Sequence, residues 1–399
     1  MIPSSFSERF ARLDALLTAT RQWWQNQPYH HTDFCFAAHS PALVEALLGL
    51  SDEQVLALEE SGNELVAFLS PWIVEGSELQ QLAALPQWVA DAVTVDPFMA
   101  RDTPGRKWEQ ILAFTGVLPA HQGPWLEWCA GKGHLGRVVS LTRKAPVTSL
   151  EWQAMLCSEG THLAQRDGAQ QQFVHGDAFS ADAAALVHPE HHALALHACG
   201  ELHMTLMRHV AARGARGVTL SPCCYHLISS DTYQPMSQQA RRSALRLGKA
   251  DLRLPLQETV TAGARVRRLR QQEVSWRLAF DSLQREVRGI DSYLAVPNMQ
   301  KSLLSGSFEA FCRWAADARG ITLPAQIDAE RWLAQGARRA RIVLRTELVR
   351  QLFRRPLELW LVLDRACYLQ EQGYRVALGE FCARPLTPRN IVIRAERPV

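Results

Sequence analysis

Hydrophobic and polar residues follow a helical pattern in the first part of the chain. From Ser5 to about Gln87, apolar residues recur at spacings of three and four positions. Ser40-Pro41 and Ser51-Asp52-Glu53 are typical helix starts, with a capping residue followed by proline or by acids. These features predict that residues 1–95 form an all-helical unit.

A different pattern occupies the middle of the chain, where short apolar runs alternate with helical stretches. Strands that are connected through helices pair in parallel, with right-handed crossovers. The pattern therefore predicts a parallel α/β sheet. The five runs are WLEWC (125–129), APVTSLEW (145–152), QQFVHGDAF (171–179), HALALHACG (192–200) and RGVTLSPCCY (216–225).

The last part of the chain returns to helical spacing, from Ser237 to about Gly373, and then ends in two more strand-like runs. These are YRVALGEFC (374–382) and NIVIRAE (390–396), joined by the turn-rich sequence ARPLTPR. A short connection of this kind suits an antiparallel hairpin. We expect residues 230–372 to form a helical insertion and residues 373–399 to complete the sheet.

A glycine-rich segment follows the first predicted strand. In WLEWCAGKGHLGR, Glu127 precedes Gly131, Gly133 and Gly136, which is how a strand ends and a helix begins in nucleotide-binding sheets. The glycine spacing also fits dinucleotide binding, so Glu127 decides between the two cofactors. A carboxylate there suits the ammonium or ribose hydroxyls of S-adenosylmethionine (SAM) better than a pyrophosphate. Cys129 stands where a first glycine is usual.

Acids also end the second and third predicted strands. Glu151 can accept hydrogen bonds from ribose hydroxyls, although NAD enzymes place an acid there too. In GDAF, Asp177 can accept from an adenine amino group, while Ala178 and Phe179 flank the ring. Each acid alone could be a helix cap or a turn residue. An acid after all three strands favours SAM.

Two further sequences, LHACGELH (196–203) and SPCCYH (221–226), follow the fourth and fifth strands. Because parallel strands share a carboxyl edge, we expect these two sequences to meet there. His226 is a candidate base, and Tyr225 is a candidate stacking or orienting group. The cysteines of the predicted catalytic set are Cys199, Cys223 and Cys224.

The same tips invite a zinc interpretation, because His197, Cys199, Cys223 and Cys224 could supply four ligands. None of them has ligand spacing within one loop, and adjacent cysteines rarely bind one ion. The alternative is that Cys199 and Cys223 are small buried fillers. We therefore expect no metal.

HACG, CCYH, the helix PGRKWEQI and the closing TPRN resemble a methyltransferase-like family. That family includes the glutathione S-transferase C-terminal-domain-containing protein and the ribosomal RNA adenine dimethylase domain-containing protein. The chain is also similar to enzymes that 2′-O-methylate the tRNA acceptor stem. The resemblance covers residues 97–229 and 374–397. It implies SAM binding by Lys107, Glu127, the glycine loop, Glu151 and Asp177, with PCCYH facing the methyl group.

The predicted protein is thus a SAM-dependent methyltransferase. We expect an α/β, Rossmann-like class I methyltransferase sheet of five parallel strands and an antiparallel C-terminal pair, with residues 96–229 as its SAM-binding domain. The predicted cofactor contacts are Lys107, Glu127, Cys129, Gly131, Gly133, His134, Gly136, Glu151, Asp177, Ala178 and His197.

The net charge is +3, but the charged residues are unevenly distributed along the chain. Residues 1–100 hold three arginines and no lysine against thirteen acids, whereas residues 241–288 hold twelve Arg or Lys against five acids. A second basic stretch covers residues 338–355. Arginine-rich helices with nearby tryptophans can follow a phosphate backbone and stack on unpaired bases, which makes RNA the leading substrate. The alternative is that these arginines form the solvated faces of amphipathic helices.

Other function classes remain open. A protein or small-molecule methyltransferase would bind its acceptor through the acidic N-terminal helices. A non-catalytic SAM-binding or NAD-dependent module is disfavoured by Glu127 and by the polar strand tips. We expect no DNA partner, and the sequence does not predict the oligomeric state.

Cysteine content and hydropathy bear on the compartment. The nine cysteines form no CxxC pair and are odd in number, which fits a reduced cytoplasm better than a disulfide framework. No apolar run approaches the roughly 20 residues needed to span a bilayer, and the first 25 residues lack a signal-peptide pattern. We expect a soluble cytoplasmic protein with no membrane partner.

Overall fold

The computed structural model describes residues 5–257 and 264–398, and it divides into two compact units. The first, which we call the sheet unit, comprises Met1–Thr18, Leu79–Val260 and Arg354–Val399. The second, the helical unit, comprises Ala19–Glu78 and Thr261–Phe353. Each unit is assembled from segments that are distant in the sequence.

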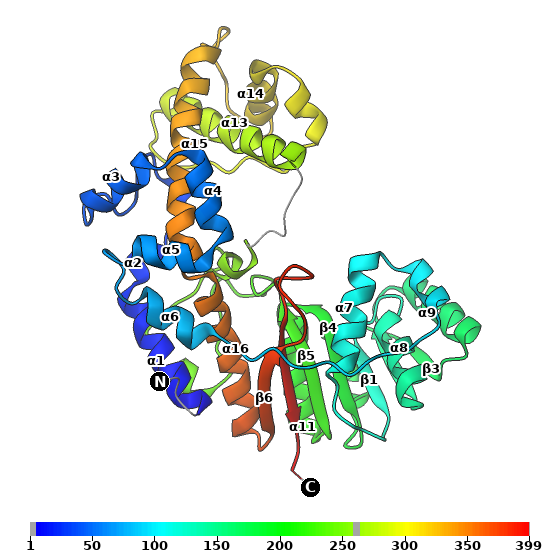
Figure 1. Cartoon of the computed structure of the whole chain (residues 1–399). Helices are drawn as coiled ribbons and strands as arrows, with labels where there is room; N and C mark the ends of the chain where they lie inside the picture. Colours follow the sequence, from blue (N-terminus) through cyan, green and yellow to red (C-terminus); the bar gives the residue numbers. More distant parts are fainter. Residues whose placement is uncertain (1–4, 258–263, 399) are drawn as a thin grey trace. The chain divides into compact units, whose positions relative to one another are not determined.

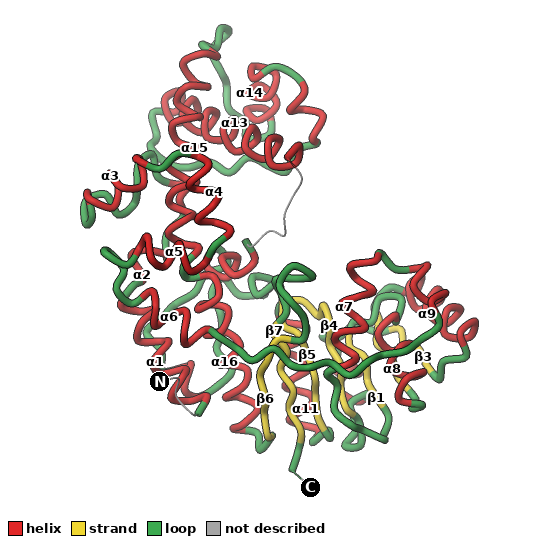
Figure 2. Tube along the Cα trace, viewed as in Figure 1, coloured by secondary structure: helices red, strands yellow, loops and turns green. Residues whose placement is uncertain are grey.

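A seven-stranded sheet in the order β3-β2-β1-β4-β5-β7-β6 forms the centre of the sheet unit (Figure 1, Figure 2). Strands β1 to β5 pair in parallel, and β7 lies antiparallel between β5 and β6. The strand order reverses between β1 and β4, where open α/β sheets bind ligands. The strands are β1 Trp125–Trp128, β2 Val147–Glu151, β3 Gln171–His175, β4 His192–Cys199, β5 Gly217–Cys223, β6 Arg375–Glu380 and β7 Ile391–Glu396.

All seven predicted strands are present, which confirms the predicted α/β fold with five parallel strands and an antiparallel C-terminal pair. Between β5 and β6 the described residues contain helices and loops but no strand, as the helical spacing predicts. The β6–β7 pair runs in register from Arg375 opposite Glu396 to Glu380 opposite Ile391. The end of the chain therefore completes a sheet that was begun near residue 125.

Helices pack on both faces of the sheet because successive side chains of a strand point in opposite directions. In β1, Glu127 lies under α8, whereas the Trp128 indole donates to the Leu202 carbonyl of α11 at 3.1 Å. α9 packs on β2 and β3, and α16 packs on β6 and β7. The helices of this unit are α1 Phe6–Ala19, α6 Gly76–Ala83, η2 Pro97–Asp102, α7 Gly105–Gly116, α8 His134–Arg143, α9 Ala154–Asp167, α10 Ala181–Ala185, α11 Glu201–Arg213, α12 Gln238–Arg241, η3 Asp251–Leu256 and α16 Arg354–Glu371, with α1 and α6 crossing its boundary.

The apolar core between α7, α8 and the sheet fixes where the glycine-rich segment lies. Trp108 and Phe114 of α7, Val138 of α8, and Trp125 and Val147 of the strands are all buried in this cluster. Burial of large apolar side chains is the main stabilising contribution to such a core. α7 and α8 are therefore held firmly over the carboxyl half of β1.

These two units divide the chain differently from the four predicted segments. α1 packs on α16 through Phe10 and Trp360, whose ring centroids lie 5.1 Å apart, and the Trp360 indole donates to Asp14 at 2.8 Å. Residues 230–257 and 354–371 also belong to the sheet unit. Buried Asp364 links these two segments, because it accepts from the Tyr233 hydroxyl at 2.6 Å and from two backbone amides of the first segment.

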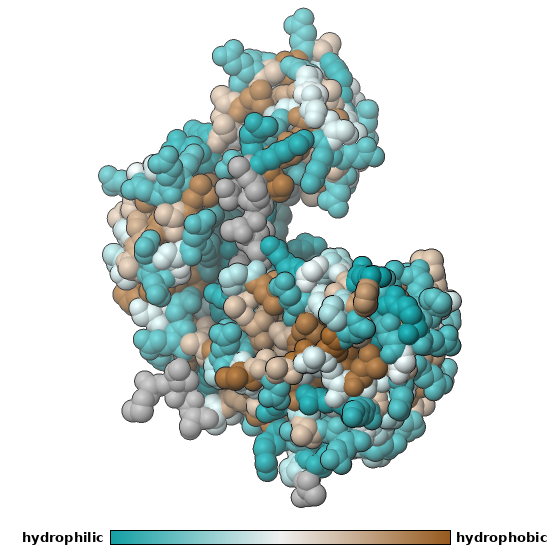
Figure 3. Space-filling view, turned by 45° about the vertical axis from the view of Figure 1, so that its right-hand side comes forward, coloured by the Kyte–Doolittle hydropathy of each residue, from teal (hydrophilic) through white to brown (hydrophobic). Residues whose placement is uncertain are grey.

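Hydrophobic side chains also reach the surface of the sheet unit. In the view of Figure 3, brown surface gathers on part of this unit and is bordered by teal, hydrophilic residues. Contiguous apolar surface commonly marks a binding site. The large apolar side chains that are exposed on this unit are Val89, Phe98, Trp152, Met155, Phe179 and Leu227.

The helical unit packs its helices around aromatic side chains. Trp276, Phe280, Phe308, Phe311 and Trp332 form one buried cluster. In the described part of the chain, no helix combines the length and apolar character that crossing a membrane requires. The helices of this unit are α2 Arg21–Trp24, η1 Pro28–His30, α3 Pro41–Gly49, α4 Asp52–Glu60, α5 Gly62–Leu69, α13 Ala264–Arg288, η4 Lys301–Ser305, α14 Phe308–Asp317 and α15 Ala329–Gln351.

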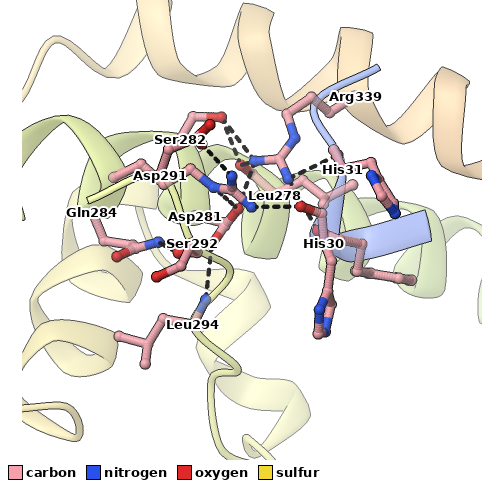
Figure 4. Close-up of polar contacts among 12 residues, drawn as sticks. His30, His31, Leu278, Asp281, Ser282, Gln284, Asp291, Ser292, Leu294 and Arg339 are labelled. Atoms are coloured by element: carbon pink, nitrogen blue, oxygen red, sulfur yellow. Dashed lines mark hydrogen bonds and ion pairs between the residues drawn. The ribbon is translucent and has the colours of Figure 1, made fainter. Parts of the chain in front are cut away.

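A buried carboxylate, Asp281, joins α13 to α15 in this unit (Figure 4). Its Oδ2 accepts from Arg285 Nε and from Arg339 Nη1, both at 2.8 Å. Its Oδ1 accepts from Gln284 Nε2 at 2.8 Å and from the Leu294 amide at 3.1 Å. Arg339 also donates to the Tyr29 and His31 carbonyls, so the network includes the segment around η1.

We expect Asp281→Asn to destabilise the helical unit by about 3–5 kcal/mol, because it leaves the Arg339 guanidinium buried without a counter-charge. The exposed pair Glu286–Arg331 provides the matched control, and Glu286→Gln should cost less than about 1 kcal/mol. Urea unfolding and hydrogen exchange of α13 and α15 measure both effects. Equal losses for the two variants would contradict the central role of Asp281.

Candidate active site

Left-handed backbone conformations shape the glycine loop between β1 and α8. Cys129, Gly131 and Gly133 have φ angles of 58°, 59° and 64°. A Cβ on Gly133 would overlap the Phe173 ring, and one on Gly136 would lie 2.5 Å from Glu127 Oε2. Gly131 differs, because nothing lies within 4 Å of the Cβ position there. Close packing therefore requires glycine at positions 133 and 136, whereas the space around the Cβ position of Gly131 is open.

Glu127 lies beneath this loop and is only 4% exposed. Its Oε2 accepts from the Ser149 hydroxyl at 2.7 Å and from Gln171 Nε2 at 3.3 Å. Burial raises the pKa of Glu127 to about 7, although these hydrogen bonds and the charge of Lys107 act in the opposite direction. Glu127 therefore supports the loop from below, and its contact with SAM stays a prediction.

Glu151 holds the loop from the end of β2. Its Oε2 accepts from the Gly131 amide at 2.8 Å, and its Oε1 accepts from the Gln153 amide at 3.0 Å. The carboxylate is 5% exposed and lies beside the open space at Gly131. Glu151 therefore fixes the loop backbone, and its contact with a ribose stays a prediction.

The end of β3 presents a mixed polar and apolar surface. Asp177 is exposed, and its Oδ1 accepts from the Phe179 amide at 2.9 Å, while Ala178 is buried. The exposed fractions of Trp152, Met155 and Phe179 are 68%, 66% and 57%. Sequence reasoning missed Trp152 and Met155, although a large apolar residue directly after a strand-ending acid was a usable signal. Apolar side chains beside an acid suit an adenine ring.

The open position at Gly131, the carboxylates at the ends of β2 and β3, and these apolar side chains together fit a SAM molecule lying along the carboxyl edge of the sheet. When bound, SAM supplies an electrophilic methyl group. The residues of this chain bind and orient it. Lys107 is exposed on α7. Burial is the largest cause of the pKa shifts of Glu127, His134 and His197, and the charge of Lys107 makes a smaller contribution that lowers each pKa.

His134 was predicted to contact the cofactor, but its side chain is buried. Burial and the neighbouring Arg137 lower its pKa to about 4, so the imidazole is neutral and accepts from Arg137 at 3.1 Å. The structure therefore places the side chain of His134 within the protein. His197 is exposed at the end of β4 with a φ of 72°.

Backbone hydrogen bonds join the tips of β4 and β5. The Gly200 amide donates to the Cys223 carbonyl and the Glu201 amide to the Leu227 carbonyl, both at 3.0 Å. A Cβ on Gly200 would overlap the Leu227 carbonyl, so the close approach requires glycine. The HACG and PCCYH sequences meet, as predicted, and bring together the thiols of Cys199, Cys223 and Cys224.

These thiols differ in their surroundings. Cys199 Sγ lies 3.5 Å from Cys223 Sγ, and Cys224 has a φ of 47°. Hydrogen bonds from Cys199 and Cys223 hold the pKa of the Cys224 thiol well below its usual range, while its neighbours and burial raise the pKa of Cys223. Burial and nearby carboxylates raise the pKa of Cys129 to about 12. Of these thiols, Cys224 thus has the greatest thiolate character.

Tyr225 does not face a substrate. It is 1% exposed, and its hydroxyl donates to Glu358 Oε1 at 3.3 Å. Arg365 Cζ lies 5.2 Å from the ring centroid. The predicted stacking role of Tyr225 is therefore wrong, because the side chain packs inward between β5 and α16. His226 is half-buried, and its buried Nδ1 has no hydrogen-bond partner within the described structure.

The basic stretch 338–355 is only partly available for its predicted use as an RNA surface: Arg338 and Arg341 are exposed, whereas Arg339, Arg345, Arg350 and Arg355 are buried. Arg345 is fully buried and donates to the Leu47 and Leu50 carbonyls, Arg350 donates to the Trp24 carbonyl, and Arg355 pairs with Glu358. In the stretch 241–288 the exposed arginines are Arg241, Arg242, Arg246, Arg253, Arg265, Arg268 and Arg270, whereas Arg277 and Arg285 bond within the protein.

Stability should fall between about pH 4.5 and pH 7 because Glu127 is protonated in the folded protein but ionised in the unfolded chain over this range. The loss from this group is about 3 kcal/mol. Glu127→Gln should remove this loss and unfold at a higher temperature than the parent protein above about pH 7. Thermal unfolding across this pH range, with Glu109→Gln on the exposed face of α7 as control, measures the difference. An unchanged pH profile in Glu127→Gln would contradict this interpretation.

Comparison with known proteins agrees with this site. Residues 115–231 match a family model described as a methyltransferase domain, and this segment contains the glycine loop and the tips of β1 to β5. No curated protein matches the chain.

Several solved structures share parts of the fold. An RNA methyltransferase from Salinibacter ruber with S-adenosyl-L-homocysteine is 17% identical over 33% of this chain and 85% of that chain, with a TM-score of 0.24. An rRNA methylase from Streptococcus thermophilus is 8% identical over 30% and 71%, with a TM-score of 0.23. Coclaurine N-methyltransferase, bound to N-methylheliamine and SAH, is 12% identical over 72% and 95%, with a TM-score of 0.25.

TM-scores this low do not support conclusions about the site. The family match and the strand topology confirm the prediction of a SAM-dependent methyltransferase domain in this chain.

Proposed function

We propose that the protein transfers a methyl group from SAM to RNA, with the acceptor nucleotide held at the tips of β4 and β5. The observation that carries this proposal is a set of three cationic side chains beside these tips: Lys107, Arg253 and Arg389. RNA is polyanionic, and cations that lie along its path supply most of its sequence-independent affinity.

Hydrogen bonds hold two of these cations beside β5. The Ser221 hydroxyl of β5 donates to the Arg389 carbonyl at 3.2 Å. The Arg389 guanidinium in turn donates to the Leu256 carbonyl at 2.9 Å, at the end of the η3 turn that carries Arg253. Arg389 is therefore fixed at the carboxyl end of the strand that bears Cys223, and the η3 turn that carries Arg253 is bonded to it.

The helix that carries Lys107 bonds to the β6–β7 connection, which also holds Arg389. Gln110, one turn later on α7, donates to the Leu386 carbonyl of the β6–β7 connection at 3.4 Å. These charges also affect the histidines at the strand tips. Burial is the largest cause of the lowered pKa of His226, and Arg253 lowers it further. Burial is also the largest cause of the lowered pKa of His197, to which Lys107 and Arg389 add.

A second cationic surface belongs to the helical unit. Arg265, Arg268 and Arg270 are exposed on the first turns of α13. Exposed arginines of this kind bind RNA phosphates, in contrast to the buried Arg339, Arg345 and Arg350 of α15. The proton-accepting role of His226 stays a prediction.

Radiolabelled SAM incubated with the protein and with extract from cells that lack it tests the acceptor. Label should enter the RNA fraction, and label confined to protein or to small molecules would overturn the RNA proposal. Arg253→Ala should weaken RNA binding and reduce the slope of its salt dependence by about one. Arg375→Ala is the control, because it removes another exposed charge at the start of β6, away from the carboxyl ends of β4 and β5. It should leave RNA affinity and the slope of its salt dependence unchanged.

Placement of SAM has its own matched test, because Gly131 and Gly168 are both left-handed with open space around their Cβ positions. Alanine at either should cost about 1 kcal/mol of backbone strain. Only Gly131→Ala puts a methyl group where SAM would lie, so we expect at least a tenfold loss of SAM affinity in calorimetry for that variant. Equal SAM affinities in the two variants would place the cofactor elsewhere.

A further inference from the structure

Cys199, Cys223 and Cys224 form a cluster that no step of the proposed methyl transfer uses. Their sulfur atoms all lie within 4.8 Å of one another. β4 and β5 pair so that Cys199 is directly opposite Cys223, after a register shift between Leu196 and Cys199. Cys223 is buried, whereas Cys199 and Cys224 are half-buried. The cluster is therefore reachable from the surface at one side.

The sequence argued against a metal at this place, because adjacent cysteines rarely bind one ion. Adjacent side chains of an extended strand point to opposite faces. The backbone removes that objection. Cys224 leaves the strand with a left-handed φ of 47°, which turns its thiol toward the other two. The objection from adjacent cysteines thus does not hold for this turn.

The sulfur spacing agrees with the bond lengths of zinc. Two thiolates at about 2.3 Å from one zinc ion, at the tetrahedral angle, lie about 3.8 Å apart. Cys199 Sγ and Cys223 Sγ are 3.5 Å apart, and the third sulfur is within 4.8 Å of both. Small side-chain rotations would bring all three to this distance. A disulfide requires about 2.0 Å between two sulfurs and would leave the third unused.

The surrounding backbone already holds this arrangement. The Gly200 amide donates to the Cys223 carbonyl at 3.0 Å, and the Leu227 amide donates to the Cys224 carbonyl at 2.9 Å. Both strand tips are thereby fixed without help from the thiols. A metal site that is preorganised in this way loses little conformational entropy on binding.

We propose that Cys199, Cys223 and Cys224 bind a zinc ion as three thiolate ligands at the joined tips of β4 and β5. Zinc prefers four ligands, so a further protein group, a water molecule or a substrate atom would complete the site. The ion would tie the two predicted substrate loops together. This proposal does not depend on which molecule accepts the methyl group.

Metal analysis of the full chain, purified without a histidine tag from zinc-supplemented cells, tests the proposal. We expect about one zinc ion per chain. Cys199→Ser, Cys223→Ser and Cys224→Ser should each lower the zinc content by roughly tenfold or more. Cys157→Ser, a buried cysteine on α9 outside the cluster, should retain the parent value. Equal zinc content in all variants, or none in the parent protein, would overturn the proposal.

A second measurement avoids variants that fail to fold. The parent protein, stripped of metal under reducing conditions, is titrated with Co²⁺ and then with Zn²⁺. Thiolate-to-cobalt charge-transfer absorption and intense visible bands of a tetrahedral complex are expected, and zinc should abolish them. Zinc should also protect the three cluster cysteines, but not Cys35, from alkylation in mass spectrometry. Octahedral cobalt spectra with unprotected thiols, or a disulfide within the cluster of the untreated protein, would contradict a thiolate zinc site.

Discussion

The burial of one carboxylate, Glu127, under the glycine loop is the constraint on which the rest of the site depends. It bonds to Ser149 of β2 and Gln171 of β3, and it occupies the space that a side chain at Gly136 would need. One group thus joins three strands and the first turn of α8. Because ionising a buried carboxylate is costly, this contact is held at the expense of stability near neutral pH. The site is built on a group that would otherwise be avoided in a core.

Backbone strain is concentrated at the same edge of the sheet. Four non-glycine residues of the described chain have positive φ angles, and three of them, Cys129, His197 and Cys224, follow or end β1, β4 and β5. Left-handed conformations cost non-glycine residues about 1–2 kcal/mol each. Strain of this kind persists where the surrounding contacts impose it, and it is characteristic of functional sites. The three central strands thus end in turns that redirect their side chains toward one place.

The sequence predicted the sheet more completely than the site. Alternation of apolar runs and helices located all seven strands, because most of the strands contain buried apolar residues, although β3 has no buried position. The roles of single side chains were harder to predict, because each role depends on the direction in which the side chain points, and the local backbone angles determine that direction. Tyr225 follows Cys224, and the left-handed turn at Cys224 sends its ring toward Glu358 instead of toward the cofactor. The same turn assembles the thiols, which spacing alone argued against.

Net charge was the least reliable guide, for a physical reason. A count of arginines does not distinguish solvent-exposed guanidinium groups from buried ones. In α15 and α16, several guanidinium groups are buried and bonded to carbonyls or carboxylates, including those of Arg345 and Arg355. A guanidinium has five donors in a planar fork, which lets one side chain satisfy several buried acceptors at a helix end. Only arginines that keep their donors toward solvent can bind a polyanion. The exposed Lys107 and Arg253 are therefore better evidence for an anionic acceptor than the longer basic stretches of the sequence.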